Sequence, residues 1–241
     1  MKATRRSLFA LLAACALSNT AFAHGWVDTP LARQAWCAND GGYWWPEDGS
    51  AIPNLACKAA FEKELEVYPE NPQYPFEQIN EFSHNVEDYH NMQAVMQGVP
   101  DGLLCSAGDP KKSGMDVPSP YWHTQGLTLN ADGTFNIVFH ATAQHNPSYW
   151  EIYLSKAGFD PASAPLSWGQ LDKIASFGDL KPDGQSNYVL PSISIPAGRS
   201  GRAVIYTRWQ REDPAGEGFY NCSDVILPAP RAHATPVKST K

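Results

Sequence analysis

The chain has 241 residues, a formal net charge of −7 and 18% charged residues. An acidic surface repels phosphate backbones, so this charge argues against nucleic acid as a partner. The length fits one domain, or one domain with a large insertion. Eight Trp, ten Tyr and ten Phe predict a core rich in aromatic side chains, which bury large areas.

The first 23 residues have the pattern of a secretory signal peptide. Lys2 and two arginines precede an apolar run at residues 8–14, and Ala21-Phe22-Ala23 forms an A-x-A cleavage site. Cleavage there would make His24 the first residue and remove three cations and no acids, leaving a net charge of −10. No second stretch is apolar enough to span a membrane. We therefore expect a secreted protein, extracellular or periplasmic.

Two other interpretations of this segment remain open. Leu12-Ala13-Ala14-Cys15 also matches a lipoprotein cleavage box, which would place a lipidated Cys15 at the N-terminus. The segment Thr4-Arg5-Arg6-Ser7-Leu8 resembles a twin-arginine signal, which bears on the export route and not on the destination.

A long irregular insertion is expected from about residue 40 to 105, after a first strand. Apolar residues at helical spacing predict a helix over Ala56–Tyr68, and a second short helix over Asp88–Met96. Prolines surround both segments. Insertions of this length are usually functional.

Four cysteines follow the signal segment: Cys37, Cys57, Cys105 and Cys222. An even number in an oxidising compartment predicts two disulfides, with three possible pairings. Zinc is the competing interpretation. The spacings of 20, 48 and 117 residues contain no C-x-x-C pair, so disulfides are favoured.

From about residue 126 the pattern changes to short strands between turn signals. The predicted strands are Leu127–Leu129, Thr134–Phe139, Tyr149–Leu154, Tyr188–Ile195, Arg202–Trp209 and Phe219–Leu227. Regular short strands without a helical period indicate a β-sandwich. Residues 229–241 lack an apolar period and are predicted to be a disordered tail or a linker stub.

Two histidines are the candidate metal ligands. At a chain start, His24 would offer a free α-amine and an imidazole to one ion. If the strand continues to His145, before Pro147 ends it, alternation places His145 with Ala143 on one face and His140 on the other, so these two histidines could not chelate together. Three nitrogen donors suit copper. Because the α-amine, with a pKa of about 7.7 to 8.0, must lose its proton, binding should weaken at acid pH.

Three segments resemble the bacterial and viral type of lytic polysaccharide monooxygenase: His24–Gln34, Thr142–His145 and Gly218–Val225. Within that family the sequence is most similar to the fusolins. This finer resemblance is carried by Tyr43–Pro46, Ile52-Pro53, Ala56-Cys57, Lys112–Asp116, Arg208–Arg211 and Glu217–Cys222. The matching segments are spread over nearly the whole mature chain.

The resemblance implies that His24 and His145 form a copper-binding histidine brace. It implies that Phe219 closes one axial side of the copper and that Ala143 is the small residue near the other side. A plain core position is the alternative for Phe219. Asp224 and Trp209 are expected to be buried supports.

One position departs from the family pattern. Such proteins commonly place a glutamate beside the copper to orient the oxygen species, and alignment through residues 89–95 puts Gln93 there. A glutamine can form a hydrogen bond but cannot carry a charge. Glu87 and Asp88 are the alternatives.

The resemblance also implies an immunoglobulin-like or fibronectin-like β-sandwich, formed by a catalytic domain at residues 24–228, with the copper on a flat face. The expected partners are crystalline polysaccharide, an external electron donor, and dioxygen or hydrogen peroxide. Chitin oxidised at the first carbon is the first choice and cellulose the second. Tyr43, Trp44 and Trp45 are candidates for stacking on sugar rings, with at least one of them in the core. We expect a monomer.

Two rival functions remain, a noncatalytic chitin-binding protein and a periplasmic copper carrier. For the cysteines, we expect the pairs Cys37–Cys57 and Cys105–Cys222. The first would clip the insertion locally, and the second would tie its end to the last strand.

Overall fold

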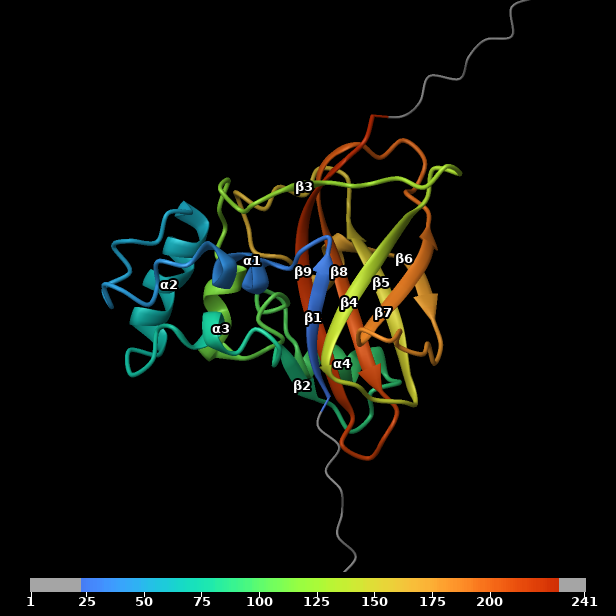
Figure 1. The fold of residues 1–241 in the computed structure, drawn as a ribbon, viewed down its shortest axis with the longest axis horizontal. Coiled ribbons are helices and arrows are strands. Elements are labelled where there is room, and N and C mark those ends of the chain that lie inside the picture. The colour runs from blue at the N-terminus through green and yellow to red at the C-terminus, as the bar shows by residue number, and fades with distance from the viewer. Residues whose placement is uncertain (1–22, 230–241) are drawn as a thin grey trace, which may run out of the picture.

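The computed structural model describes residues 23–229, and its strands form two sheets packed as a β-sandwich, as predicted (Figure 1). The three-stranded sheet has the order β1 (His24–Thr29), β4 (Phe135–Ala143), β7 (Asn187–Ile193). The six-stranded sheet has the order β2 (Ser83–Asn85), β9 (Glu217–Leu227), β8 (Gly201–Arg211), β5 (Ser148–Ser155), β6 (Leu171–Phe177), with β3 (Gln125–Gly126) beside β9. Neighbouring strands are antiparallel, except that β3 runs parallel to β9.

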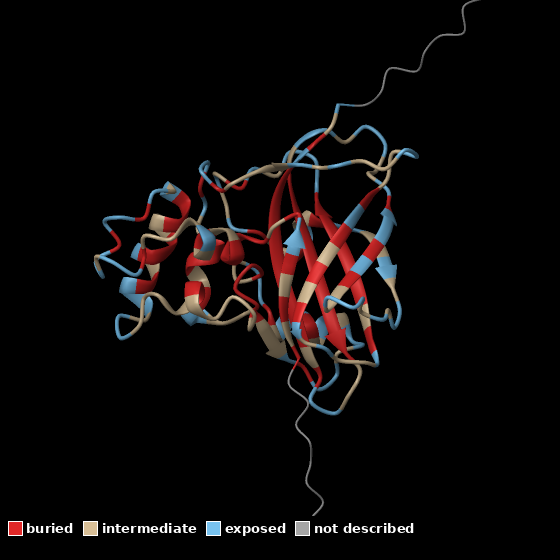
Figure 2. Cartoon of the chain, viewed as in Figure 1, coloured by how far each residue is buried: buried red, intermediate tan, exposed pale blue. Residues whose placement is uncertain are grey.

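The larger sheet has a hydrophobic core on each face. Along β8, Ala203 and Ile205 belong to the core shared with the small sheet, whereas Val204 and Tyr206 belong to the core shared with the insertion. Successive side chains of a strand point to opposite faces, so this alternation means that both faces are covered. Figure 2 accordingly shows β8 and β9 buried along most of their length.

The insertion lies on one side of the sandwich and contains the helices (Figure 1). These are α1 (Arg33–Asp40), α2 (Leu55–Val67), α3 (Tyr74–Glu77), α4 (Met92–Gly98) and the 3-10 helix η1 (Pro110–Asp116), while a further 3-10 helix, η2 (Trp168–Gln170), precedes β6. Asn54 caps α2, since its side chain accepts hydrogen bonds from the backbone N–H groups of Ala56 and Cys57.

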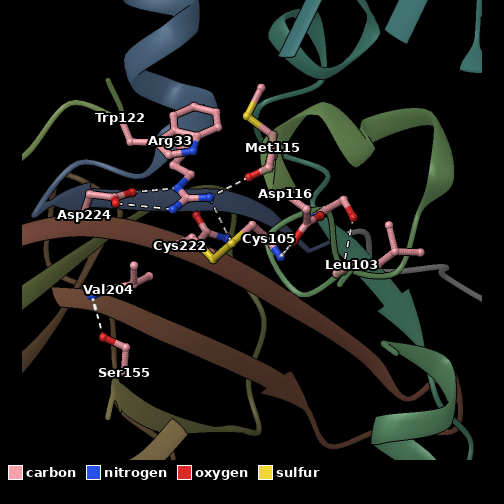
Figure 3. The surroundings of a disulfide bond; sticks show 12 residues. Arg33, Leu103, Cys105, Met115, Asp116, Trp122, Ser155, Val204, Cys222 and Asp224 are labelled. Atoms are coloured by element: carbon pink, nitrogen blue, oxygen red, sulfur yellow. Dashed lines mark hydrogen bonds and ion pairs between the residues drawn. A yellow bond between two sulfur atoms is a disulfide. The ribbon is translucent and has the colours of Figure 1, made fainter. Parts of the chain in front are cut away.

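Both predicted disulfides are confirmed. Cys37–Cys57 joins α1 to α2, and Cys105–Cys222 ties the end of the insertion to β9. All four cysteines are therefore in disulfides and not in a zinc site. Beside the second bridge, the Arg33 guanidinium binds the buried Asp224 carboxylate, with Nε–Oδ2 at 2.6 Å (Figure 3). Asp224 is thus buried, as predicted, but it supports α1 of the insertion and not the candidate site.

Several predicted elements shift in the structure. Leu127–Leu129 is not a strand, and the short β3 precedes it. The helix predicted over Asp88–Met96 begins only at Met92, because Asn91 provides its N-cap. The insertion starts earlier than residue 40, with α1, and the edge strand β6 had no clear period in the sequence.

Some predictions concern residues outside the described range. The signal segment up to residue 22, with Cys15, and most of the predicted tail, residues 230–241, belong to this group. Between residues 23 and 229, no helix has the length and apolar character that a membrane span needs.

Candidate functional site

Strand pairing brings His24 and His145 to the same end of the small sheet. His24 starts β1, and its Cα pairs with that of Ala143, the last residue of β4. His145 follows only two residues later. A Cβ on Gly25 would lie 2.3 Å from the carbonyl oxygen of His140, so glycine allows β1 to approach β4 this closely.

His145 has a buried nitrogen without a hydrogen bond. Its Nε2 lies 3.2 Å from Oδ2 of Asp213, but it has no aligned hydrogen-bond partner among the described residues. The Tyr188 hydroxyl accepts from the backbone N–H of His145 and donates to its carbonyl oxygen, which fixes the backbone. Burial and the nearby Arg211 lower the pKa of His145, while Asp213 opposes them. The neutral imidazole that a metal requires is therefore favoured.

His24 lies in an open hollow of about 510 Å³. The hollow is lined by His24, Tyr74, Glu81, Ser83, Lys112 and Glu217. Within it, Nε2 of His24 is 3.3 Å from Oε1 of Glu81. The hollow combines aromatic, acidic and basic groups at the surface, which suits contact with a polar polymer.

The turn between β8 and β9 supplies a second group of charges. Arg211 is buried and contacts Asp213 at 2.5 Å and Glu217 at 2.6 Å. Ser83 of β2 donates to the other oxygen of Glu217 at 3.0 Å. Sequence analysis did not identify these residues, or Glu81, as parts of the site. Arg211 and Glu217 do lie in the segments 208–211 and 217–222 that resemble the fusolins, and these segments lie on the adjacent strands β8 and β9.

Phe219 and Ala143 lie close in the fold to His24. Phe219 is fully buried on β9, packs against Trp209 with ring centroids 5.1 Å apart, and pairs through its Cα with Ser83, which lines the hollow. Ala143 pairs with His24 across the sheet. Trp209 itself is fully buried, in agreement with a supporting role.

Gln93 is exposed on the first turn of α4, where its N–H binds the Asn91 side chain. The helix packs away from the hollow, since Met92 contacts Arg208 on the outer face of β8. The segment preceding Glu87 is placed differently: the N–H of Val86 donates to the carbonyl of Gly216, in the turn that carries Asp213. The backbone contact thus brings the segment of Glu87 to the β8–β9 turn, while the Glu87 side chain itself is exposed.

The aromatic face requires one correction. Tyr43 is only 4% exposed, and its hydroxyl donates to the carbonyl of Phe76, so it belongs to the insertion core and cannot stack on a sugar. Trp44 and Trp45 are 58% and 78% exposed. The side chain of Gln73 donates to the carbonyl of Tyr43. This hydrogen bond joins the loop that contains Trp44 and Trp45 to the start of α3, whose Tyr74 lines the hollow.

Comparisons with known proteins identify the family. Residues 24–225 match the family model described as "Lytic polysaccharide mono-oxygenase, cellulose-degrading". Spindolin of Heliothis armigera entomopoxvirus is 35% identical over 237 residues, covering 85% of this chain and 66% of spindolin. Chitin-binding protein CbpD of Pseudomonas aeruginosa is 32% identical over 219 residues, covering 91% of this chain and 51% of CbpD.

A solved structure shows the same similarity. The fusolin of Wiseana spp entomopoxvirus spindles superimposes with a TM-score of 0.76 at 32% identity, covering 90% of this chain and 88% of that chain. The chain thus spans about half to two thirds of the two curated relatives, and most of the fusolin structure.

Proposed function

Because the chain belongs to the lytic polysaccharide monooxygenase family, we propose that it is a secreted copper enzyme that cleaves glycosidic bonds in crystalline chitin by oxidation at the first carbon. The observation that supports the proposal is the pairing of His24 with Ala143, two residues before His145, which brings the segments of both histidines to one end of the small sheet. Members of this family are copper enzymes.

The residues present fit a copper ion. The donor set would be the α-amine and imidazole of His24 and the imidazole of His145, and three nitrogens suit copper. Nε2 of His145 is a buried polar atom without an aligned hydrogen bond, as expected of a nitrogen reserved for a metal. Bound copper would supply one-electron chemistry that activates dioxygen or hydrogen peroxide toward a C–H bond.

The protein would position this chemistry and restrict it. Phe219 would cover the bound ion from one side, and the small Ala143 would leave room beside it. Burial keeps His145 neutral. Glu87, with Gln93 as the alternative, would orient the oxygen species through a hydrogen bond. Trp44 and Trp45 project their side chains into solvent, where they could stack on sugar rings of a polymer too large to enter a pocket.

Chitin is preferred over cellulose because CbpD carries the name of a chitin-binding protein and matches 91% of this chain. The matching family model is described as cellulose-degrading, so cellulose remains the second candidate substrate. Two rival functions remain. A noncatalytic chitin binder would bind the polymer without oxidising it, and a copper carrier would bind the metal without binding the polymer.

One experiment separates these functions. Intact mass of the secreted protein should first show a chain starting at His24. The copper-loaded protein is then incubated with β-chitin or cellulose, with and without ascorbate, and the soluble products are analysed by mass spectrometry. We expect oxidised chitin oligosaccharides only with ascorbate. Chitin binding without oxidised products would indicate the binder, copper binding without chitin binding the carrier, and a lipidated Cys15 would exclude the brace.

A further inference from the structure

Three rings form an aromatic surface beside the start of β5. The imidazole of His90 stacks on the ring of Tyr149, with centroids 5.7 Å apart and an angle of 13° between the planes, and its centroid lies 4.5 Å from that of the Tyr89 ring. His90 is exposed, whereas Tyr89 and Tyr149 are half-buried. These three residues, called the aromatic trio below, belong neither to the proposed copper ligands nor to the loop of Trp44 and Trp45.

A buried arginine holds the aromatic trio in place. Arg208 is 1% exposed, its Nη2 donates to the Tyr89 carbonyl at 2.8 Å, and its guanidinium carbon lies 5.4 Å from the centre of the Tyr149 ring. The Tyr149 hydroxyl donates to the same carbonyl at 3.1 Å. Glu151 accepts from Nη1 of Arg208 at 2.9 Å and balances its charge. The rings are therefore fixed before a ligand arrives, which lowers the entropic cost of binding on them.

The aromatic trio adjoins the end of the sandwich that carries the candidate ligands. Tyr149 is the second residue of β5 and follows His145 by four residues. A Cβ added at Gly216 would lie 3.1 Å from Cδ1 of Tyr89, so this ring lies against the β8–β9 turn. The next residue, Glu217, lines the hollow described above. One turn of the chain therefore contacts both the trio and the hollow.

We propose that the aromatic trio is a second contact surface for the polysaccharide, on which sugar rings stack. This inference rests on the proposed function, which makes an extended polymer the substrate. Such a polymer runs past the metal across the protein surface, so a surface that adjoins the candidate site lies within its reach. Tyrosine and histidine rings have an apolar face and a polar edge, which suit the C–H faces and hydroxyl edges of a sugar ring. Together with Trp44 and Trp45, the trio would hold the polymer from two separate parts of the chain.

The test compares His90→Ala and the double variant Tyr89→Ala/His90→Ala with the wild type, using Tyr121→Ala as a matched control. Tyr121 is 56% exposed and lies in a loop outside the trio. Binding of the metal-free proteins to β-chitin is measured by their depletion from solution. We expect His90→Ala to bind roughly five-fold more weakly, about 1 kcal/mol, and the double variant to lose more, because stacked rings are removed. Tyr121→Ala should match the wild type, and so should His90→Phe, which keeps a ring on Tyr149.

The outcomes separate the two proposals. Wild-type protein that does not bind β-chitin would overturn the proposed substrate and, with it, the role of the trio. Wild-type protein that binds β-chitin while the double variant binds equally well would overturn only the role of the trio. Copper affinity and thermal midpoints should stay equal, because every variant keeps the backbone carbonyl that Arg208 and Tyr149 bind. Variants that change self-association in sedimentation, and not chitin binding, would make the trio a contact between copies of this chain and overturn its assignment to the polymer.

Discussion

The two candidate ligands are supported by different regions of the molecule. His24 meets Glu81, whose segment is fixed by Lys112 of the insertion. His145 meets Asp213, which is fixed by Arg211 in the turn between β8 and β9. In each case a buried cation holds the segment or the acid that contacts the histidine. The candidate site is therefore assembled where the insertion meets the sandwich, and each half can be disturbed without the other.

The two histidines differ in how the neighbouring acid, Glu81 or Asp213, is held. Arg211 binds the carboxylate of Asp213 itself, whereas Lys112 binds the main chain of Glu81 and leaves its carboxylate available. An acid already paired with an arginine is a weaker acceptor for a second partner.

The largest effect is expected from removal of a ligand. His145→Ala should weaken copper binding by roughly 100-fold or more, about 2.8 kcal/mol, because one of three nitrogen donors is lost. Oxidised product should fall with it. His140→Ala, on β4 five residues earlier, is the matched control, since His140 contacts Asn187. Calorimetry with copper and product analysis check both variants, and equal losses in the two would contradict the assignment of His145.

The next largest effect is a change of stability with pH, which should be confined to the insertion. Glu64 on α2 is fully buried, accepts from the N–H of Gly114 in η1 at 2.6 Å, and burial raises its pKa to about 7. Its folded pKa lies above the unfolded value of about 4.3, so its contribution to stability is complete below that value and is lost as pH rises through about 7. Glu64→Gln should therefore be more stable than the wild type above pH 7, by on the order of 2 kcal/mol.

Hydrogen exchange locates this effect. As pH rises from 5 to 8, exchange corrected for its intrinsic pH dependence should increase in α2 and η1 of the wild type and not in the β8–β9 turn. Glu64→Gln should remove that difference, while Glu66→Gln, a change at an exposed acid on the same helix, should not. An equal increase of exchange in α2, η1 and the β8–β9 turn would show that the insertion and the turn do not respond independently to pH.

Much of the fold could be predicted because strands and cysteines leave strong local signals. Alternation in residues 134–139 and the apolar runs at 202–209 and 219–227 gave the sandwich. The edge strand β6 was missed because it pairs only with β5, and its side chains follow no strict alternation of burial. β3 has only two residues, too short for any period.

The site was only partly predictable for a different reason. His24 and His145 carry local signals, a cleavage site and a strand end, and the fold pairs His24 with Ala143, two residues before His145. Glu81 and Asp213 reach the site from irregular segments whose position depends on tertiary pairing, so sequence spacing could not identify them. Tyr43 was indistinguishable from its exposed neighbours because all three aromatics lie in one irregular loop.

A smaller effect should distinguish Glu87 from Gln93. The backbone pairing of Val86 with Gly216 places Glu87 near the turn of Asp213, so Glu87→Ala should slow peroxide-driven chitin oxidation by roughly ten-fold, about 1.4 kcal/mol in barrier terms. Neither residue is a ligand, so copper affinity should stay nearly unchanged. Gln93→Ala is the paired variant and should keep wild-type turnover. The opposite result, a slow Gln93→Ala and a normal Glu87→Ala, would restore the alignment-based assignment.

The smallest expected effect concerns Trp45, in the loop of the insertion that also contains Tyr43 and Trp44. Trp45 is 78% exposed, so Trp45→Ala should leave the free energy of unfolding unchanged and weaken chitin binding a few-fold, since each exposed stacking contact is worth about 1 kcal/mol. Tyr43→Ala should leave chitin binding unchanged and lower the free energy of unfolding. Its ring is buried and packs on Phe76, with centroids 5.0 Å apart, so its loss should destabilise the insertion. Chitin pull-down and denaturant unfolding of the two variants measure both effects. If Trp45→Ala bound chitin like the wild type, the polymer would have to be held by the hollow around His24 instead.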